Sequence, residues 1–234
     1  MITQDTLREH TDRPMGLLSV LVADDHPLMR EAVKGYIESA PDMTCAGTAD
    51  DGASAVELAL QTEPDVIVMD IQMPEKDGIQ ATAEILQHRP TAAVLTVTTF
   101  DQELYAVRSL QAGARGYLLK SARAEELLQA IRGVASGEVP LSPKVAEDLI
   151  LEAARDSASI RRSLSRYNIP EVPERQLAVL KLLGRGYSNA EIADELFLAE
   201  DTVKKYLQRL NDRFETRDRV QLLIRAVQLG FIEP

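Results

Sequence analysis

Residues 66–70 read VIVMD, a short run of apolar residues that ends in an aspartate. Runs of this length and character are typical of strands that are buried on both faces of a parallel sheet. Three further apolar runs end at Asp24-Asp25, at Thr98 and at Lys120. Because ligands bind outside the carboxyl ends of the strands in an open parallel sheet, we expect these polar side chains to share one edge.

The predicted edge combines three carboxylates, a hydroxyl group and an ammonium group. Carboxylates suit a hard divalent metal ion, and a hydroxyl with an ammonium suits the oxygens of a phosphoryl group. Clustered carboxylates would raise one another's pKa values unless a cation offsets their repulsion. A single strand-end aspartate such as Asp70 is usually a helix cap or a loop carboxylate. Its coincidence with matching residues on three other strands favours a metal-assisted phosphoryl site.

Composition restricts the classes of protein that remain. The 234 residues carry 26 basic and 37 acidic side chains, a net charge of −11, which argues against nonspecific polyanion binding by the whole chain. Residues 1–136 hold 11 basic and 21 acidic residues, whereas residues 171–234 hold 10 and 11. Cys45 is the only cysteine, so an intramolecular disulfide and a cysteine metal cluster are excluded. Without a signal-peptide pattern or an apolar run of membrane-spanning length, the chain is expected to be cytoplasmic and not membrane-bound.

Strand and helix patterns alternate between residues 17 and 137. A fifth strand is expected at 43–47, and apolar residues recur at helical spacing after every strand. The helices are expected at 28–37, 56–60, 79–86, 104–112 and 124–135. Five such βα units predict a parallel sheet that is covered by helices on both faces.

The remaining segments divide into a tail, a linker and a helical domain. Residues 1–16 are expected to be an N-terminal tail, and residues 138–170 a linker that includes a connecting helix opened by Ser142-Pro143. From residue 171 to 234 the pattern is purely helical. Ser188 and Glu191 form a capping box at the start of a short helix, and a second helix follows closely. Two short helices joined in this way predict a helix-turn-helix.

The chain resembles the bacterial two-component response regulators of the NarL/FixJ family, which join a receiver domain to a LuxR-type helix-turn-helix. The resemblance rests on the acidic pair, the VIVMD strand followed by MP, the hydroxyl residue and the sequence GYLLK. It also rests on the sequence GYSNAEIA at 186–193, followed by TVK at 202–204. It implies an α/β flavodoxin-like (βα)5 receiver with a doubly wound parallel sheet, at 17–137. A small all-α helix-turn-helix domain that binds DNA would follow at 171–234.

The resemblance also implies a role for each strand-end residue. Asp70 would accept the phosphoryl group, Thr98 would donate a hydrogen bond to it, and Lys120 would pair with it. Tyr117 would be the aromatic residue that changes rotamer on activation. The Mg²⁺ ligands would come from the acidic pocket, that is, from Asp24, Asp25, Asp70 and the backbone carbonyl of Gln72. His26 is expected to open a helix and not to bind metal, because no second histidine or cysteine accompanies it.

Several positions depart from the family pattern. Ser121 follows Lys120 where a proline is common, so the usual cis-proline is not expected. Ala199 replaces the serine that caps the recognition helix, a loss of roughly 1 kcal/mol unless another group caps it. Tyr206 replaces a common histidine, Glu215 replaces a common glycine, and Pro173-Glu174-Arg175-Gln176 replaces the usual entry to the domain. These changes affect the expected DNA sequence preference more than DNA binding itself.

The second helix of the helix-turn-helix is expected to meet DNA. Burying its apolar stripe turns the basic residues outward, although a near-neutral domain is also compatible with an ordinary solvated face. The residues expected at the DNA interface are Thr202, Lys204, Lys205, Gln208 and Arg209. The last helix, 219–229, is either a dimer face or part of the core.

The combined prediction is a transcription regulator that a sensor histidine kinase phosphorylates on Asp70 and that binds promoter DNA as a homodimer. RNA polymerase is a further candidate partner. An aspartate-nucleophile phosphatase of the haloacid dehalogenase class is the enzymatic alternative, but Gln72 stands where such enzymes carry a second acid. A regulator with an unused receiver is the other alternative, and the intact acidic pocket argues against it. Because Phe100 cannot orient water, slow loss of the phosphoryl group is expected.

Overall fold

The computed structural model describes residues 16–99, 103–137, 146–147, 149–151, 154 and 172–232. The predicted tail lies outside these residues except for Gly16, and so do Phe100 and most of the predicted linker. Residues 146–147, 149–151 and 154 are helical, within the predicted connecting helix. In this part of the chain, no helix is long and apolar enough to cross a membrane.

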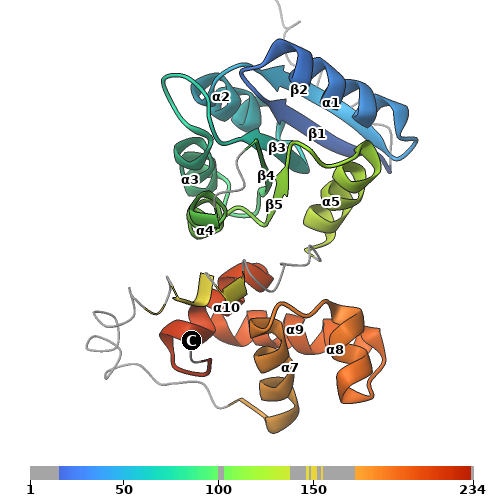
Figure 1. The fold of residues 1–234 in the computed structure, drawn as a ribbon, viewed down its shortest axis with the longest axis vertical. Coiled ribbons are helices and arrows are strands. Elements are labelled where there is room, and N and C mark those ends of the chain that lie inside the picture. Colours follow the sequence, from blue (N-terminus) through green and yellow to red (C-terminus); the bar gives the residue numbers. More distant parts are fainter. Residues whose placement is uncertain are drawn as a thin grey trace, which may run out of the picture.

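The first domain contains one five-stranded parallel sheet (Figure 1). Its strands are β1 (Leu18–Ala23), β2 (Met43–Ala49), β3 (Val66–Asp70), β4 (Ala93–Thr98) and β5 (Gly116–Leu119). The strand order is β2-β1-β3-β4-β5, so the strand that ends at Asp70 lies in the centre. This order is that of a flavodoxin-like sheet, and the predicted fold class is confirmed.

Five helices cover the sheet on both faces, as predicted. They are α1 (Pro27–Ser39), α2 (Gly52–Thr62), α3 (Gly78–His88), α4 (Glu103–Gln111) and α5 (Ala124–Ser136). One face packs Val20, Val68 and Leu95 of the sheet against Ile37 of α1 and Ile131 of α5. The other face packs its strand residues against α2, α3 and α4. Apolar residues on both faces of β1, β3 and β4 therefore explain the uninterrupted apolar runs in the sequence.

The second domain consists of helices. They are α7 (Glu174–Gly184), α8 (Asn189–Leu196), α9 (Glu200–Phe214) and α10 (Arg219–Gln228). The predicted capping box opens α8, since Ser188 and Glu191 each accept a hydrogen bond from the other's backbone N–H. Leu180, Ile192 and Leu210 are fully buried where these helices meet. The α8 and α9 helices form the predicted helix-turn-helix.

Both ends of α9 carry residues that are unfavourable for a helix terminus. Ala199 at the N-cap provides no side-chain hydrogen bond, so it does not replace the cap that a serine would supply. Glu215 at the C-cap adopts a left-handed conformation with φ of 55°. This conformation costs a non-glycine residue roughly 1–2 kcal/mol, which explains why a glycine is favourable at this position.

Replacing Glu215 with glycine is therefore expected to raise the free energy of unfolding by about 1 kcal/mol. Glu215 is exposed, so the substitution removes strain without removing a buried contact. Urea denaturation of the full chain measures the effect. The matched control is Asp212→Gly, which places the glycine at an exposed position inside α9. That variant should lose about 1 kcal/mol, and a loss of stability in both variants would show that Glu215 is not strained.

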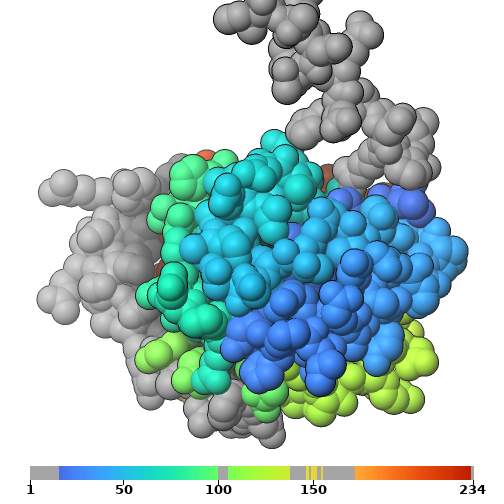
Figure 2. Space-filling view, turned by 90° about the horizontal axis from the view of Figure 1, so that it is seen from above, coloured from blue at the N-terminus to red at the C-terminus, as the bar shows by residue number. Residues whose placement is uncertain are grey.

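The helical domain lies at the end of the first domain where α4 and β5 are found (Figure 1). Viewed from above, the first domain hides almost all of it (Figure 2). The buried cluster on the α2–α3–α4 face is continuous with the core of the helical domain and includes Val107, Leu110 and Ala114. The two domains are therefore joined by packed apolar side chains as well as by the chain itself.

Candidate functional site

The carboxyl end of β1 presents the acidic pair. Asp24 and Asp25 follow β1 directly, and Pro27 opens α1 two residues later. The backbone N–H of His26 donates to Oδ1 of Asp24 at 2.8 Å, which fixes this carboxylate at the turn. Asp24 is 5% exposed, whereas the side chain of Asp25 retains 30% exposure.

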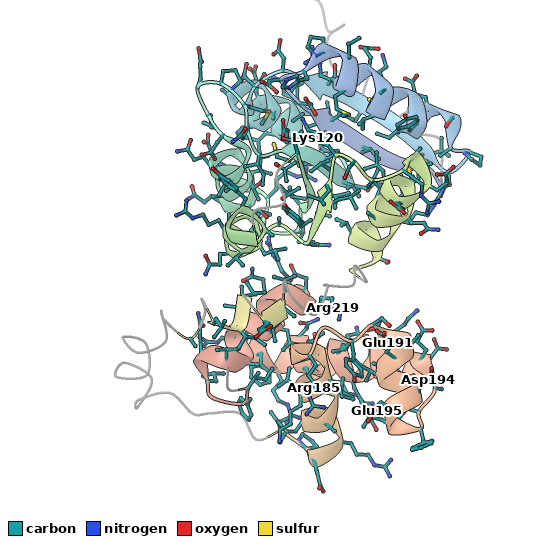
Figure 3. The ribbon with its side chains drawn as sticks, viewed as in Figure 1. Lys120, Arg185, Glu191, Asp194, Glu195 and Arg219 are labelled. Carbon is teal, nitrogen blue, oxygen red and sulfur yellow. The ribbon has the colours of Figure 1, made fainter. Side chains whose placement is uncertain are left out.

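Lys120 connects the two buried carboxylates. Its Nζ lies 2.6 Å from Oδ2 of Asp24 and 2.7 Å from Oδ2 of Asp70. The Lys120 side chain is 5% exposed, and Asp70 is 4% exposed. Figure 3 shows Lys120 within the sheet domain, away from the helical domain. The structure thus brings together three of the four predicted strand-end features at one point.

Burial and charge act on these groups in opposite directions. Burial raises the pKa of the Asp70 carboxyl, while the hydrogen bond from Lys120 works against the rise. Burial also opposes the charge of Lys120, but its hydrogen bonds to Asp24 and Asp70 raise its pKa above the usual value. Lys120 therefore stays protonated and supplies the positive charge that two adjacent carboxylates require.

The remaining predicted residues lie around this pair. Thr98 is the last residue of β4 and is buried beside the site edge. The backbone N–H of Gln72 points toward Oδ1 of Asp70 at 3.4 Å, and its side chain is exposed. Tyr117 lies in β5 and is half-buried. Among the residues that the structure describes there is no cis peptide bond, in agreement with the expectation at Ser121.

The acidic side chains are close enough to share a cation. Oxygen atoms of Asp24, Asp25 and Asp70 and a ring nitrogen of His26 all lie within 4.8 Å of one another. Nδ1 of His26 is also 2.7 Å from Oδ1 of Asp25, and its side chain is largely exposed. A set dominated by carboxylate oxygens fits a hard ion such as Mg²⁺ better than a soft one.

One residue near the site was not predicted from the sequence. Arg30, in the first turn of α1, donates from Nη1 to the backbone carbonyl of Asp24 at 2.6 Å. It holds the β1–α1 turn and adds positive charge near the acids. Its spacing after the acidic pair, one helical turn from His26, is the sequence signal that could have revealed it.

Removing Lys120 is expected to destabilise the metal-free protein. Lys120→Ala leaves two buried carboxylates without a counter-charge, and breaking a buried ion pair in this way costs about 3 kcal/mol. Added Mg²⁺ should restore part of this loss, so the variant gains more from Mg²⁺ than the wild type. Thermal or urea unfolding in chelator and in Mg²⁺ measures both quantities.

The matched control is Lys76→Ala. Lys76 pairs with Glu84 on the surface, where both side chains are partly exposed, and its loss should cost less than about 1 kcal/mol. Equal stability of Lys120→Ala and wild type in chelator would contradict the pairing described above.

The helix-turn-helix presents a basic surface on α9. Val203, Leu207, Leu210 and Phe214 are buried, as predicted. Lys205, Gln208 and Arg209 are exposed, and Thr202 and Lys204 are partly exposed. Lys204 also lies 3.6 Å from Glu200, one turn earlier. The exposed acids Glu191, Asp194 and Glu195 lie instead on α8 (Figure 3).

A sheet with strand-end acids and a lysine, joined to a helix-turn-helix, defines a class of two-domain regulator with a receiver and a DNA-binding output domain. Residues 20–132 match the response regulator receiver domain, and residues 173–226 match the LuxR family of bacterial regulatory proteins. The chain belongs to the family of two-component response regulators with a LuxR-type output domain.

Two similar proteins span both domains, and a similar crystal structure spans little more than half of the chain. The uncharacterized transcriptional regulatory protein YxjL of Bacillus subtilis is 38% identical over 92% of this chain and 98% of its own length. LiaR of the same species, also a transcriptional regulatory protein, is 35% identical over 90% and 97%. A crystal structure of a LuxR-family two-component response regulator from Aurantimonas is 34% identical, with a TM-score of 0.54. It covers 58% of this chain and 97% of that one.

Proposed function

We propose that a sensor histidine kinase phosphorylates this response regulator on Asp70, and that the phosphorylated protein binds promoter DNA as a dimer. The observation that carries the proposal is the position of Lys120, which contacts both Asp24 and Asp70 at the carboxyl edge of the sheet. The names of several relatives with the same two domains, such as LiaR, describe transcriptional regulatory proteins, which supports control of transcription by this chain.

The phosphoryl transfer follows from the chemistry of Asp70. A carboxylate oxygen of Asp70 attacks phosphorus, the bond from phosphorus to the donor breaks, and the donor leaves with the electron pair. The product is an acyl phosphate. Lys120, which is within reach of the Asp70 carboxylate, pairs with the new phosphoryl oxygens, and Thr98 donates a hydrogen bond to them.

Asp24, Asp25, Asp70 and the backbone carbonyl of Gln72 would hold Mg²⁺. When bound, the ion neutralises charge on the oxygens of the incoming phosphoryl group. The carboxylates lie within one small cluster and have oxygen donors only, which supports this assignment. Lys120 contacts oxygens of the same Asp24 and Asp70 carboxylates, so metal binding and the position of its ammonium group would be linked.

The change at Asp70 would reach the surface through β4, β5 and α4. Thr98 ends β4, and movement of its hydroxyl toward the phosphoryl group leaves space that the ring of Tyr117 would enter. The phosphoryl group on Asp70 is expected to be lost slowly because Phe100 cannot orient water. Phe100 lies between Thr98 and α4 in the sequence, outside the described residues.

The arrangement of the domains supports a regulated DNA interface. A cleft of about 290 Å³ lies between the end of α5 and α9. It is distinct from a cavity of about 450 Å³ beside α7. Ser136 and Gly137 line one side of this cleft, and Lys204, Gln208 and Asn211 line the other. A recognition helix must lie within a major groove about 12 Å wide, so the end of α5 beside Lys204 and Gln208 would interfere with a duplex docked on α9.

Dimerisation would supply much of the DNA affinity. The acids Glu200 and Asp201 in the first turn of α9 oppose phosphate, so a single output domain should bind weakly and in a salt-sensitive manner. Two linked domains on adjacent half-sites raise the effective affinity without a new contact. RNA polymerase is then the expected partner at the promoter.

The test is a gel-shift titration of a mapped promoter with the full chain at fixed salt. Treatment with acetyl phosphate and Mg²⁺ should increase the affinity by about 5- to 150-fold, because the coupling between two such sites is commonly 1–3 kcal/mol. An affinity that does not depend on the phosphodonor would support instead a regulator with an unused receiver. Continuous release of inorganic phosphate would point to the phosphatase.

A further inference from the structure

Arg217, which precedes α10, reaches from the output domain to the receiver. Its Nη1 donates to the backbone carbonyl of Pro90 at 2.8 Å, and its Nη2 donates to the backbone carbonyl of Gly113. Pro90 lies between α3 and β4, and Gly113 lies between α4 and β5. One planar guanidinium group therefore connects two loops of the receiver to the output domain.

Asp218, the next residue, also takes part in the contact between the two domains. Its Oδ1 accepts from the backbone N–H of Gln221 at 2.9 Å and so caps α10. Its Oδ2 lies 3.2 Å from Nε of Arg217 and 3.9 Å from Nε of Arg115 in the receiver. The Asp218 side chain is 2% exposed, so its charge is balanced by these two arginines and not by water.

Gly113 is shaped for this contact. Its φ of +107° favours glycine, and a Cβ atom there would collide with the guanidinium of Arg217 and with a methyl group of Leu86. The backbone of the α4–β5 loop thus approaches Arg217 as closely as the absence of a side chain allows.

These contacts lie at the C-terminal end of α4. The last carbonyl groups of a helix lack partners within the helix, and positive charge is favourable there. Nε2 of Gln221 donates to the carbonyl of Leu110 at 3.3 Å, and Arg217 binds the carbonyl of Gly113 just beyond the helix. The Leu110 carbonyl also accepts from the backbone N–H of Gly113, so the output domain adds further donors at the C-terminal end of α4. The other end of α4 lies five residues after Thr98 in the sequence.

We propose that Arg217, Asp218 and Gln221 form a clasp that holds the output domain closed by binding the C-terminal end of α4 and the two neighbouring loops. The clasp and occupancy of the phosphoryl site then oppose each other through the position of this helix. The inference rests on the proposed function and adds the residues that couple the two domains. Because coupling between equilibria is reciprocal, a phosphoryl group weakens the clasp, and loss of the clasp strengthens binding at the phosphoryl site.

Arg217→Ala tests the clasp in the full-length chain without phosphorylation. Its radius of gyration, measured by small-angle scattering, should increase as the domains separate. Its affinity for promoter DNA should rise about tenfold or more, because the affinity scales with the fraction of open protein. Its affinity for beryllium fluoride in the presence of Mg²⁺, used as a phosphoryl mimic, should rise by a comparable factor.

Two conservative variants separate the clasp from general stability. Arg217→Lys keeps the charge but not the planar group that reaches two carbonyls, so it should behave like Arg217→Ala. Asp218→Asn keeps the cap of α10 but loses the charge that pairs with Arg115, so it should open the protein with α10 intact. The matched control is Arg225→Ala on α10. In the described part of the chain Arg225 has no hydrogen bond or ion pair with the receiver, and this variant should match wild type.

Each readout has a result that overturns the proposal. Wild-type dimensions and DNA affinity in both Arg217→Ala and Asp218→Asn would show that the clasp does not hold the domains. Opening without any change in the beryllium fluoride titration would show that α4 does not couple the two sites. Failure of the proposed function is distinct, because scattering reports the clasp even if the phosphorylated wild type gains no DNA affinity.

Discussion

Asp70→Asn is expected to abolish phosphorylation of the protein. With acetyl phosphate and Mg²⁺ the wild type should gain one phosphoryl group, whereas the variant should gain none. An asparagine amide lacks the nucleophilic carboxylate oxygen, and its neutral side chain also weakens the cluster of acids that would bind Mg²⁺. Intact-mass spectrometry before and after treatment measures the outcome directly.

The matched control for this variant is Asp77→Asn. Asp77 follows Asp70 by seven residues and caps α3 by accepting from the backbone N–H of Gln80 at 2.7 Å. Asparagine caps a helix about as well as aspartate, so the control should fold and gain one phosphoryl group. A mass gain that persists in Asp70→Asn would assign the phosphoacceptor to another residue.

Lys204→Ala and Lys205→Ala are each expected to cost roughly 1–3 kcal/mol of specific DNA binding. Both residues lie in the N-terminal half of α9, the part of a recognition helix that meets base edges. The ion pair of Lys204 with Glu200 is exposed and weak, so it does not keep Lys204 from DNA. Titrations with the phosphorylated full chain on a mapped promoter, at fixed salt, measure the loss.

Lys181→Ala provides the control for these two variants. Lys181 is exposed on α7 and lines a different cavity from the residues of α9. Its removal changes the net charge by the same amount but should leave specific affinity nearly unchanged. Wild-type affinity in the double variant Lys204→Ala/Lys205→Ala would remove this surface of α9 from the DNA interface.

The fold was predictable because each local signal agreed with the global pattern. The apolar run of β3 needs burial on both faces, and the helical spacing around it supplies the covering layers. Side chains at strand ends converge in any parallel sheet, so proximity of Asp24, Asp70 and Lys120 required no knowledge of distant contacts. The capping box at Ser188 and the uncapped start at Ala199 were likewise local.

Other features depend on contacts that a pattern along the chain does not contain. The resemblance implied that Lys120 would pair with a phosphoryl group, but not that its ammonium group contacts both Asp24 and Asp70. Arg217 and Gly113 are 104 positions apart in the sequence. The residues that flank each of them in the sequence are those of an ordinary loop. The substitution of glycine by Glu215 was visible in the sequence, whereas its left-handed backbone was not.

The predicted phosphoryl site lies at the carboxyl ends of the strands, whereas the contacts to the output domain lie near their amino ends. β4 carries Thr98 at its carboxyl end, and Pro90 precedes its amino end. Six residues in a strand span about 20 Å, so a substitution at one edge leaves the other edge chemically untouched. In hybrid regulators made by exchanging output domains, phosphorylation should therefore control DNA binding only if the new output domain contacts the receiver at positions 90, 113 and 115. A hybrid with an intact acidic pocket but without these contacts would still accept a phosphoryl group, but its output domain would bind DNA whether or not the phosphoryl group is present.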